Sequence, residues 1–311
     1  MKIYYTDEFV LPLPPTHRFP MQKYALLRER IESSELARQH RLVRPPAATD
    51  EQLLRAHSLE YIQRVVSGQF SPEEIRRLGF PWSPDLVERS RRSSGATVMA
   101  CRAALTDGCA INLAGGTHHA YRDRAEGFCL FNDSVVAARD LQAEGLVARV
   151  LVIDCDVHQG NGTASIVRDD PSIYAFSIHS ERNYPQPKEI SDLDIGLPDG
   201  TSDAEYLAAL ERGLATSFRE SNPDLAIFLA GADPYQGDRL GRLALTLAGL
   251  ATRDRLVLTT CRSEKTPVAI SMAGGYCPDI QQIVDCHFQT VSIAAELFSA
   301  DHSGSFHGSE K

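Results

Sequence analysis

The chain has 311 residues, of which 43% are apolar and 23% are charged, and its formal net charge is −9 at pH 7. This composition is typical of a soluble globular protein that buries a sizeable core without disulfides. The acidic balance and the lack of a Lys/Arg-rich run argue against direct nucleic-acid binding, and the lack of about 18 consecutive apolar residues argues against a membrane-spanning segment.

The seven cysteines form no CxxC pair, and most of them lie within apolar runs. This pattern favours a reduced protein, so we expect a cytoplasmic location. The first residues, MKIYYTDEFVLPLPP, also lack the basic segment and the continuous apolar stretch of a signal peptide.

Helical and strand patterns alternate along the chain. In chain order they predict a helix over residues 22–38, a strand over 109–116, a helix over 135–145, strands over 148–157 and 172–180, a helix over 203–221, a strand over 224–233, a helix over 243–256 and a strand over 267–275. Hydrophobicity in the strand segments is continuous, which is typical of parallel strands covered on both faces. The sequence therefore predicts a single α/β domain over residues 1–300, with three α/β/α layers around a mostly parallel central sheet, and a disordered polar tail over residues 301–311.

Polar and reactive side chains follow four of these predicted strands. They are His118 and His119 after the first strand, Asp154, Asp156 and His158 at the end of the second, Asp233 after the strand over 224–233, and Tyr276 after the last strand. In open α/β sheets, ligands bind outside the carboxyl ends of the strands. We therefore expect these side chains to converge at one edge of the sheet.

Asp156, His158 and Asp233 form a candidate metal site. Asp156 and His158 are two residues apart in an extended segment, so their side chains share one face. Burying acidic groups costs several kcal/mol unless a positive charge compensates them, and a metal cation would do so. Catalytic zinc typically has three protein ligands and keeps an open position. The alternative is that Asp156 and His158 cap the turn after the strand.

The adjacent histidines of GGTHH, His118 and His119, are candidate proton carriers, because an imidazole can accept a proton from water and return it to a leaving amine. Such a base needs an orienting partner, and Asp154 and Asn161 on the neighbouring loop are available. The phenol of Tyr276 could donate a hydrogen bond to a developing oxyanion. On its own, however, the sequence GGY is better explained as a turn with a packed aromatic side chain.

Several stretches together resemble the histone deacetylase family in its broad sense, which includes bacterial acetylpolyamine amidohydrolases and acetoin-utilisation-like proteins. They are LAGGTHHAYRDRAEGFCLFND, VLVIDCDVHQGNGT, FSIHSERNYP, LAGADPYQGDRLG and AGGY, in the family's order over residues 100–280, together with HRFPMQKYALLRE and HSLEYI near the N-terminus. HRFPMQKY and DVHQGNG point toward the class IV and related bacterial branch. The resemblance implies an arginase/deacetylase-like fold.

The resemblance also implies a role for each matching position. The zinc ligands, for one Zn²⁺ per chain, would be Asp156, His158 and Asp233. The catalytic residues would be His118, His119, Asp154, Asn161 and Tyr276, with His119 as the general base. A structural K⁺ would be bound by Asp154 and by carbonyl groups around Ser177 and Ile178. The substrate channel would be formed by Phe128 and Tyr184 as aromatic walls, Gly127 at the mouth, Leu240 at the side and Gly275 next to the catalytic tyrosine.

The resulting expectation is a zinc-dependent amidohydrolase that removes an acetyl or longer acyl group from an acyl-lysine or a related N-acylated amine. An acetylpolyamine or small-metabolite deacetylase is the first alternative, because the region GQFSPEEIRRLGFPWSP has diverged from the family pattern. A ureohydrolase with two manganese ions and a catalytically silent binder of acylated ligands are the other two. Asn161 stands where many relatives carry an Asp, so we expect a lower pKa for His119 than in those relatives.

Overall fold

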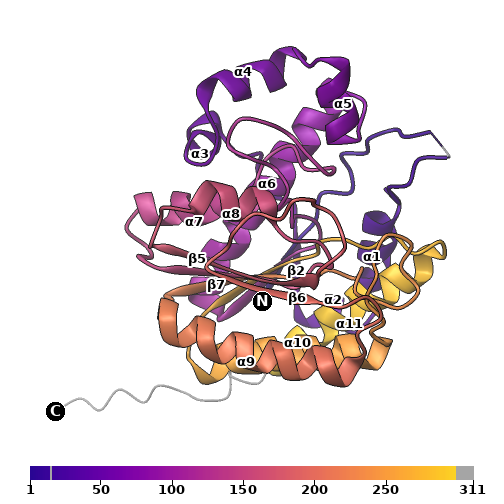
Figure 1. The fold of residues 1–311 in the computed structure, drawn as a ribbon, viewed down its shortest axis with the longest axis vertical. Helices are drawn as coiled ribbons and strands as arrows, with labels where there is room; N and C mark the ends of the chain where they lie inside the picture. The colour runs from indigo at the N-terminus through magenta and orange to yellow at the C-terminus, as the bar shows by residue number, and fades with distance from the viewer. Residues whose placement is uncertain (15, 299–311) are drawn as a thin grey trace.

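The computed structural model describes residues 1–14 and 16–298, and its centre is an eight-stranded sheet (Figure 1). The strands are β1 (Lys2–Tyr4), β2 (Arg41–Val43), β3 (Cys109–Asn112), β4 (Val150–Asp154), β5 (Ile173–Ser180), β6 (Leu193–Leu197), β7 (Leu225–Leu229) and β8 (Val268–Ser271). Their order across the sheet is β2-β1-β3-β8-β7-β4-β5-β6, and every neighbouring pair is parallel. This confirms the predicted α/β class. The tail predicted over residues 301–311 lies outside the described residues.

Ten of the described helices lie in the connections between these strands, and α11 follows the last strand. They are α1 (Lys23–Glu32), α2 (Leu36–Gln39), α3 (Asp50–Leu54), α4 (Leu59–Ser67), α5 (Pro72–Leu78), α6 (Pro84–Asp107), α7 (Asp133–Ala143), α8 (Asn161–Val167), α9 (Asp203–Ser221), α10 (Leu247–Ser263) and α11 (Ile280–Phe298). Caps in the sequence set several of the boundaries. The long helix α6, for example, begins after Ser83, whose side chain accepts from the Leu86 N–H, and ends at Gly108 with φ 76°. No helix in the described part of the chain is long and apolar enough to cross a membrane.

Two apolar cores lie on opposite faces of the sheet, because successive side chains of each buried strand point to opposite faces. In β4, Val152 belongs to the core that includes Val135 of α7, whereas Ile153 belongs to the core that includes Leu214 of α9 and Val257 of α10. Figure 1 shows α6 and α7 on one side of the sheet and α9 and α10 on the other. Covering both faces explains the continuous hydrophobicity of the strands.

Some predicted boundaries differ from the structure. The helix predicted over 22–38 is two helices, α1 and α2, separated at Ser33 and Ser34, whose hydroxyls bond back to the Glu29 and Ile31 carbonyls. The helix predicted over 243–256 begins at 247, because Leu245 forms a parallel bridge with Tyr235. The patterns considered in the sequence also did not predict β1, β2, β6, α3, α4, α5, α6, α8 and α11.

Candidate active site

Four neighbouring strands of the sheet, β3, β8, β7 and β4, deliver the residues expected in the site. The loop after β3 carries His118 and His119, and the loop after β8 carries Tyr276. The loops after β7 and β4 carry the acidic residues and His158. Because parallel strands end at the same edge, side chains up to 158 positions apart in the chain meet there.

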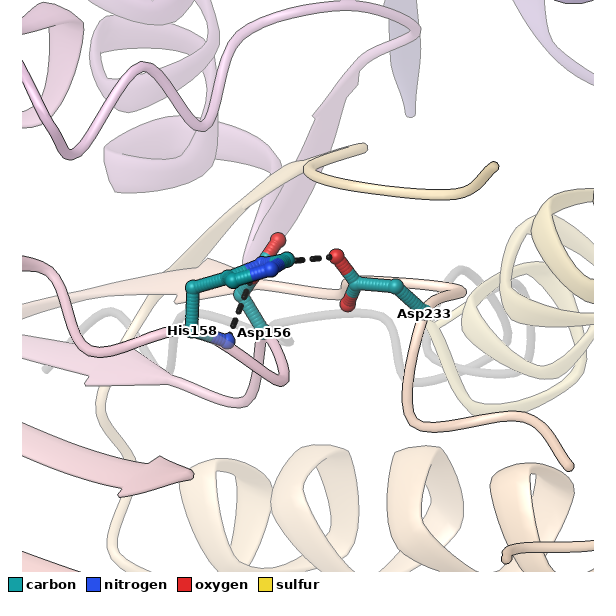
Figure 2. A group of neighbouring side chains, drawn as sticks. All are labelled: Asp156, His158 and Asp233. Atoms are coloured by element: carbon teal, nitrogen blue, oxygen red, sulfur yellow. Dashed lines mark hydrogen bonds and ion pairs between the residues drawn. The ribbon is translucent and has the colours of Figure 1, made fainter. Parts of the chain in front are cut away.

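Asp156 and His158 after β4 lie against Asp233 after β7, as Figure 2 shows. All three side chains are buried, and their potential ligand atoms lie within 4.8 Å of one another. Nδ1 of His158 is 2.9 Å from Oδ1 of Asp156 and 3.3 Å from Oδ2 of Asp233. Within residues 1–14 and 16–298, this is the group of at least three His, Cys, Asp or Glu side chains that could hold a metal ion.

The surroundings of this group fit a divalent cation. Apart from its ion-pair contact with His158, Oδ2 of Asp233 is buried without a hydrogen-bond partner in the described chain. Burial, and then the charge of Asp156, raise the pKa of Asp233 to about 7, so the neighbouring His158 compensates this carboxylate only in part. The Gly274 N–H donates to Oδ2 of Asp156 at 2.8 Å, and a methyl group on Gly274 would lie 1.9 Å from Oδ2 of Asp233. Two oxygen ligands and one nitrogen ligand are a donor set that zinc accepts.

The two histidines each have a different partner. Nδ1 of His118 lies 2.6 Å from Oδ2 of Asp154, and Nδ1 of His119 lies 2.6 Å from Oδ1 of Asn161. The amide nitrogen of Asn161 donates to Tyr121 Oη and to Glu126 Oε1, which orients its oxygen toward His119. Since that oxygen only accepts, Nδ1 of His119 carries the hydrogen and Nε2 is left as an acceptor.

These partners give the two imidazoles opposite pKa shifts. Burial lowers the pKa of His118, but the carboxylates of Asp154 and Asp156 outweigh burial and raise it to about 9. Burial lowers the pKa of His119 far below its ordinary value, and positive charge on His118 and His158 lowers it further. His119 is therefore the neutral imidazole of the pair, the form that can accept a proton.

Tyr276 lies in the loop after β8, and its phenol hydroxyl makes no hydrogen bond with the described residues while its side chain lines the cavity. Burial and the nearby carboxylates of Asp156 and Asp233 raise the pKa of Tyr276 well above its ordinary value, so the phenol keeps its proton. The buried ammonium of Lys23 donates to the carbonyl of Ala273 at 3.3 Å and lies 5.5 Å from the centre of the Tyr276 ring.

A cavity of about 470 Å³ connects the surface with His119, His158 and Tyr276. Gly127, Phe128, Tyr184 and Leu240 line it, as expected for the substrate channel. The rings of Tyr184 and His119 are 5.0 Å apart. Gly127 has φ 54°, and a Cβ there would lie 2.5 Å from Cδ2 of His119, so the close approach of this loop to the histidine requires glycine.

The remaining predicted positions lie away from the cavity. Gly275 does not line it, because a Cβ there would point toward Ile283 and Ala232 in the core. Ser177 and Ile178 lie in β5, where Ser177 is the register partner of Asp154. The potassium site assigned to them stays a prediction.

Lys23 and Asp133 are among the supporting residues that have no assigned role in the sequence analysis. The carboxylate of Asp133 accepts from the backbone N–H groups of Gly116 and Thr117 directly before the two histidines. Both lie inside the stretches that carry the resemblance, HRFPMQKY and FCLFND. Their positions were therefore visible in the sequence, but their contacts were not.

Comparisons with known proteins identify the family and the fold of this chain. The chain is 41% identical over 285 residues to an uncharacterized protein of Picosynechococcus sp., covering 92% of this chain and 95% of that protein. It is 28% identical to histone deacetylase 2 of Arabidopsis thaliana, and the match covers 89% of this chain and 74% of that protein. The crystal structure of the HDA15 HD domain has the same fold, with a TM-score of 0.79 and 21% identity. The match covers 96% of this chain and 93% of that one. A model of the histone deacetylase domain matches residues 17–291, so the chain belongs to the histone deacetylase family.

Proposed function

We propose that this protein is a zinc-dependent hydrolase that removes an acetyl or longer acyl group from an acyl-lysine or a related N-acylated amine. The observation that carries the proposal is the convergence of three possible metal ligands, a neutral histidine and a protonated tyrosine on one cavity. Membership of the histone deacetylase family supports the deacylase chemistry.

Asp156, His158 and Asp233 would hold one zinc ion. When bound, zinc supplies Lewis-acid activation of the acyl carbonyl and lowers the pKa of water. The positive charge would also compensate Asp233, whose Oδ2 otherwise lacks a hydrogen-bond partner among the described residues.

His119 is the general base in this proposal. Its Nδ1 is engaged by Asn161, so Nε2 accepts the proton of the attacking water. The same nitrogen then returns that proton to the departing amine. His118, held by Asp154, places a positive charge beside this step, since its pKa is about 9.

Tyr276 donates its phenol proton to the oxygen of the substrate carbonyl as negative charge develops there. The phenol is suited to donation because burial and two carboxylates keep it protonated. Two hydrogen bonds hold its loop in place. Lys23 donates to the carbonyl of Ala273, and the carboxylate of Asp238 accepts from the Tyr276 N–H. A fixed donor is worth more than a mobile one because it needs no reorganisation during the reaction.

Phe128 and Tyr184 would contact the methylene groups of the substrate, with Leu240 on another side of the channel. The structural K⁺ at Asp154, Ser177 and Ile178 and the cytoplasmic location belong to the proposal as well. The seven cysteines are all buried and unpaired, which supports a reducing location.

The test uses Tyr276→Phe with fluorogenic acyl-lysine peptides of increasing acyl length, with and without a hydroxamate inhibitor. We expect the variant to retain its metal and to lose about 10²–10³-fold in kcat. Tyr174→Phe is the matched control, because that phenol bonds to Glu220 at the protein surface. Unchanged turnover in Tyr276→Phe would reject the assigned role. Two manganese ions per chain, measured by metal analysis, would instead favour a ureohydrolase.

A further inference from the structure

The mouth of the cavity is rich in arginine. Five arginines line it, and they come from four separate segments: Arg18 before α1, Arg76 and Arg77 in α5, Arg182 after β5 and Arg242 before α10. All five are exposed to solvent. None of the described residues that line this cavity is an Asp or a Glu.

Three of these arginines are not paired with an acidic side chain among the described residues. The side chains of Arg18, Arg76 and Arg182 make no hydrogen bond or ion pair with the residues that the structure describes. Arg77 and Arg242 are paired, with Glu73 and Asp199 respectively, each at 3.1 Å.

The positive mouth contrasts with the rest of the protein. The chain as a whole carries a net charge of −9, so a cluster of cations around the cavity is not a consequence of overall composition. The carboxylate nearest to the aromatic walls, Glu126, is already bonded to Tyr184 and Asn161 and lies in ion-pair range of Arg124. A localised field of this kind attracts ligands of opposite charge and repels ligands of the same charge.

We propose that the substrate carries a negatively charged group, a carboxylate or a phosphate, on the part that stays outside the channel. This inference rests on the proposed deacylase function and names its substrate class. Guanidinium groups bind carboxylates and phosphates through paired hydrogen bonds, and Arg18, Arg76 and Arg182 have their donors available. An acetylated polyamine or a Lys/Arg-rich acetylated peptide would meet three unpaired like charges at the same place.

The first measurement compares kcat/KM for acyl-lysine peptides that differ only in the residues flanking the lysine: Asp, Gln or Lys. We expect the Asp-flanked peptide to exceed the Lys-flanked peptide by about tenfold or more at low ionic strength. Added salt should lower the rate for the Asp-flanked peptide and raise it for the Lys-flanked one.

A second pair of substrates tests a small-molecule source of the charge. It consists of Nα-blocked, Nε-acylated lysine with a free carboxylate and the same compound as its carboxamide. A preference for the carboxylate in this pair alone points to a free N-acylated amino acid, and a preference in both series points to an acidic peptide.

The variants Arg76→Gln and Arg182→Gln should each reduce the preference for the Asp-flanked peptide by about threefold, and the double variant by about tenfold. The Gln-flanked peptide is the reference in each variant, so the preference is the ratio of two kcat/KM values measured on the same protein. Arg41→Gln is the matched control, because Arg41 is an exposed arginine at the start of edge strand β2, away from the carboxyl ends of the strands.

The outcomes separate this inference from the function on which it rests. Absence of any preference in both substrate series, or a preference for the Lys-flanked peptide, overturns the inference while the deacylase function stands. Failure of the zinc-loaded protein to hydrolyse any of these peptides or either Nε-acylated lysine compound, at any acyl length, overturns the deacylase function, and the inference with it.

Discussion

Replacing Gly274 by alanine should disable the proposed metal site without removing any of the three proposed ligands. A methyl group on Gly274 would lie 1.9 Å from Oδ2 of Asp233 and 2.5 Å from Oδ2 of Asp156. Ordinary contacts begin at 3.4 Å, so the Asp233 oxygen would have to move by at least 1.5 Å. The backbone itself allows alanine, because Gly274 is not among the residues with positive φ.

The displacement exceeds what a zinc site accepts, since ligand distances vary by only about 0.2 Å. We expect zinc affinity to fall by at least about 100-fold, with kcat/KM falling in parallel. The crowding itself should cost about 1–3 kcal/mol in the free energy of unfolding, which leaves a domain of this size folded.

Zinc affinity is measured by competition with a chromogenic chelator, and folding by circular dichroism and thermal unfolding. Gly196→Ala is the control, because a methyl group there would have its nearest contact at 3.6 Å. If folded Gly274→Ala binds zinc as tightly as the unaltered protein, then Asp156 and Asp233 do not hold the metal as proposed.

Three further predictions concern the surroundings of the metal site. Lys23→Met should lower kcat about tenfold with little change in KM, because the loop that carries Tyr276 loses its hydrogen bond from Lys23 while the proposed metal ligands stay in place. Steady-state kinetics combined with metal analysis measures this effect, and an unchanged kcat would contradict the prediction. Asn161→Asp should raise the pKa of His119 and move the acid limb of the pH–rate profile upward by about one unit, whereas an unshifted limb would show that another group sets it. In the metal-free protein, His118 and His158 have pKa values raised to about 9 and about 10 from 6.5, so between pH 7 and 8.5 the folded state holds protons that the unfolded chain has released. Its urea-unfolding free energy should therefore fall as pH rises through this range, and a stability that rises instead would refute the assignment.

The central part of the fold could be predicted because its strands are buried on both faces. β4 and β7, for example, are completely buried, and their continuous apolar sequences indicate parallel strands. The strands that were missed give a weaker signal. β1 and β2 have three residues each, and β6 is an edge strand in which exposed and partly buried residues alternate.

The same distinction applies to the site. Asp156, His158 and the two histidines stand in short motifs next to predicted strands, so their approximate location follows from the sequence. The contact between Lys23 and Ala273 joins positions 250 residues apart, and no local pattern specifies it. The arginines of the cavity mouth were missed for a similar reason, because four segments far apart in the chain supply them.

The separate placement of the proposed catalytic residues and most of the entrance arginines has an evolutionary consequence. The proposed reacting groups stand on loops of four adjacent central strands. Four of the five arginines at the entrance lie outside these loops, and Arg242 shares the loop after β7 with Asp233. Replacing an exposed arginine usually changes the free energy of unfolding little, whereas replacing a buried residue of the site usually destabilises the protein. Substitutions at the entrance can therefore change substrate specificity during evolution while the proposed catalytic residues stay the same.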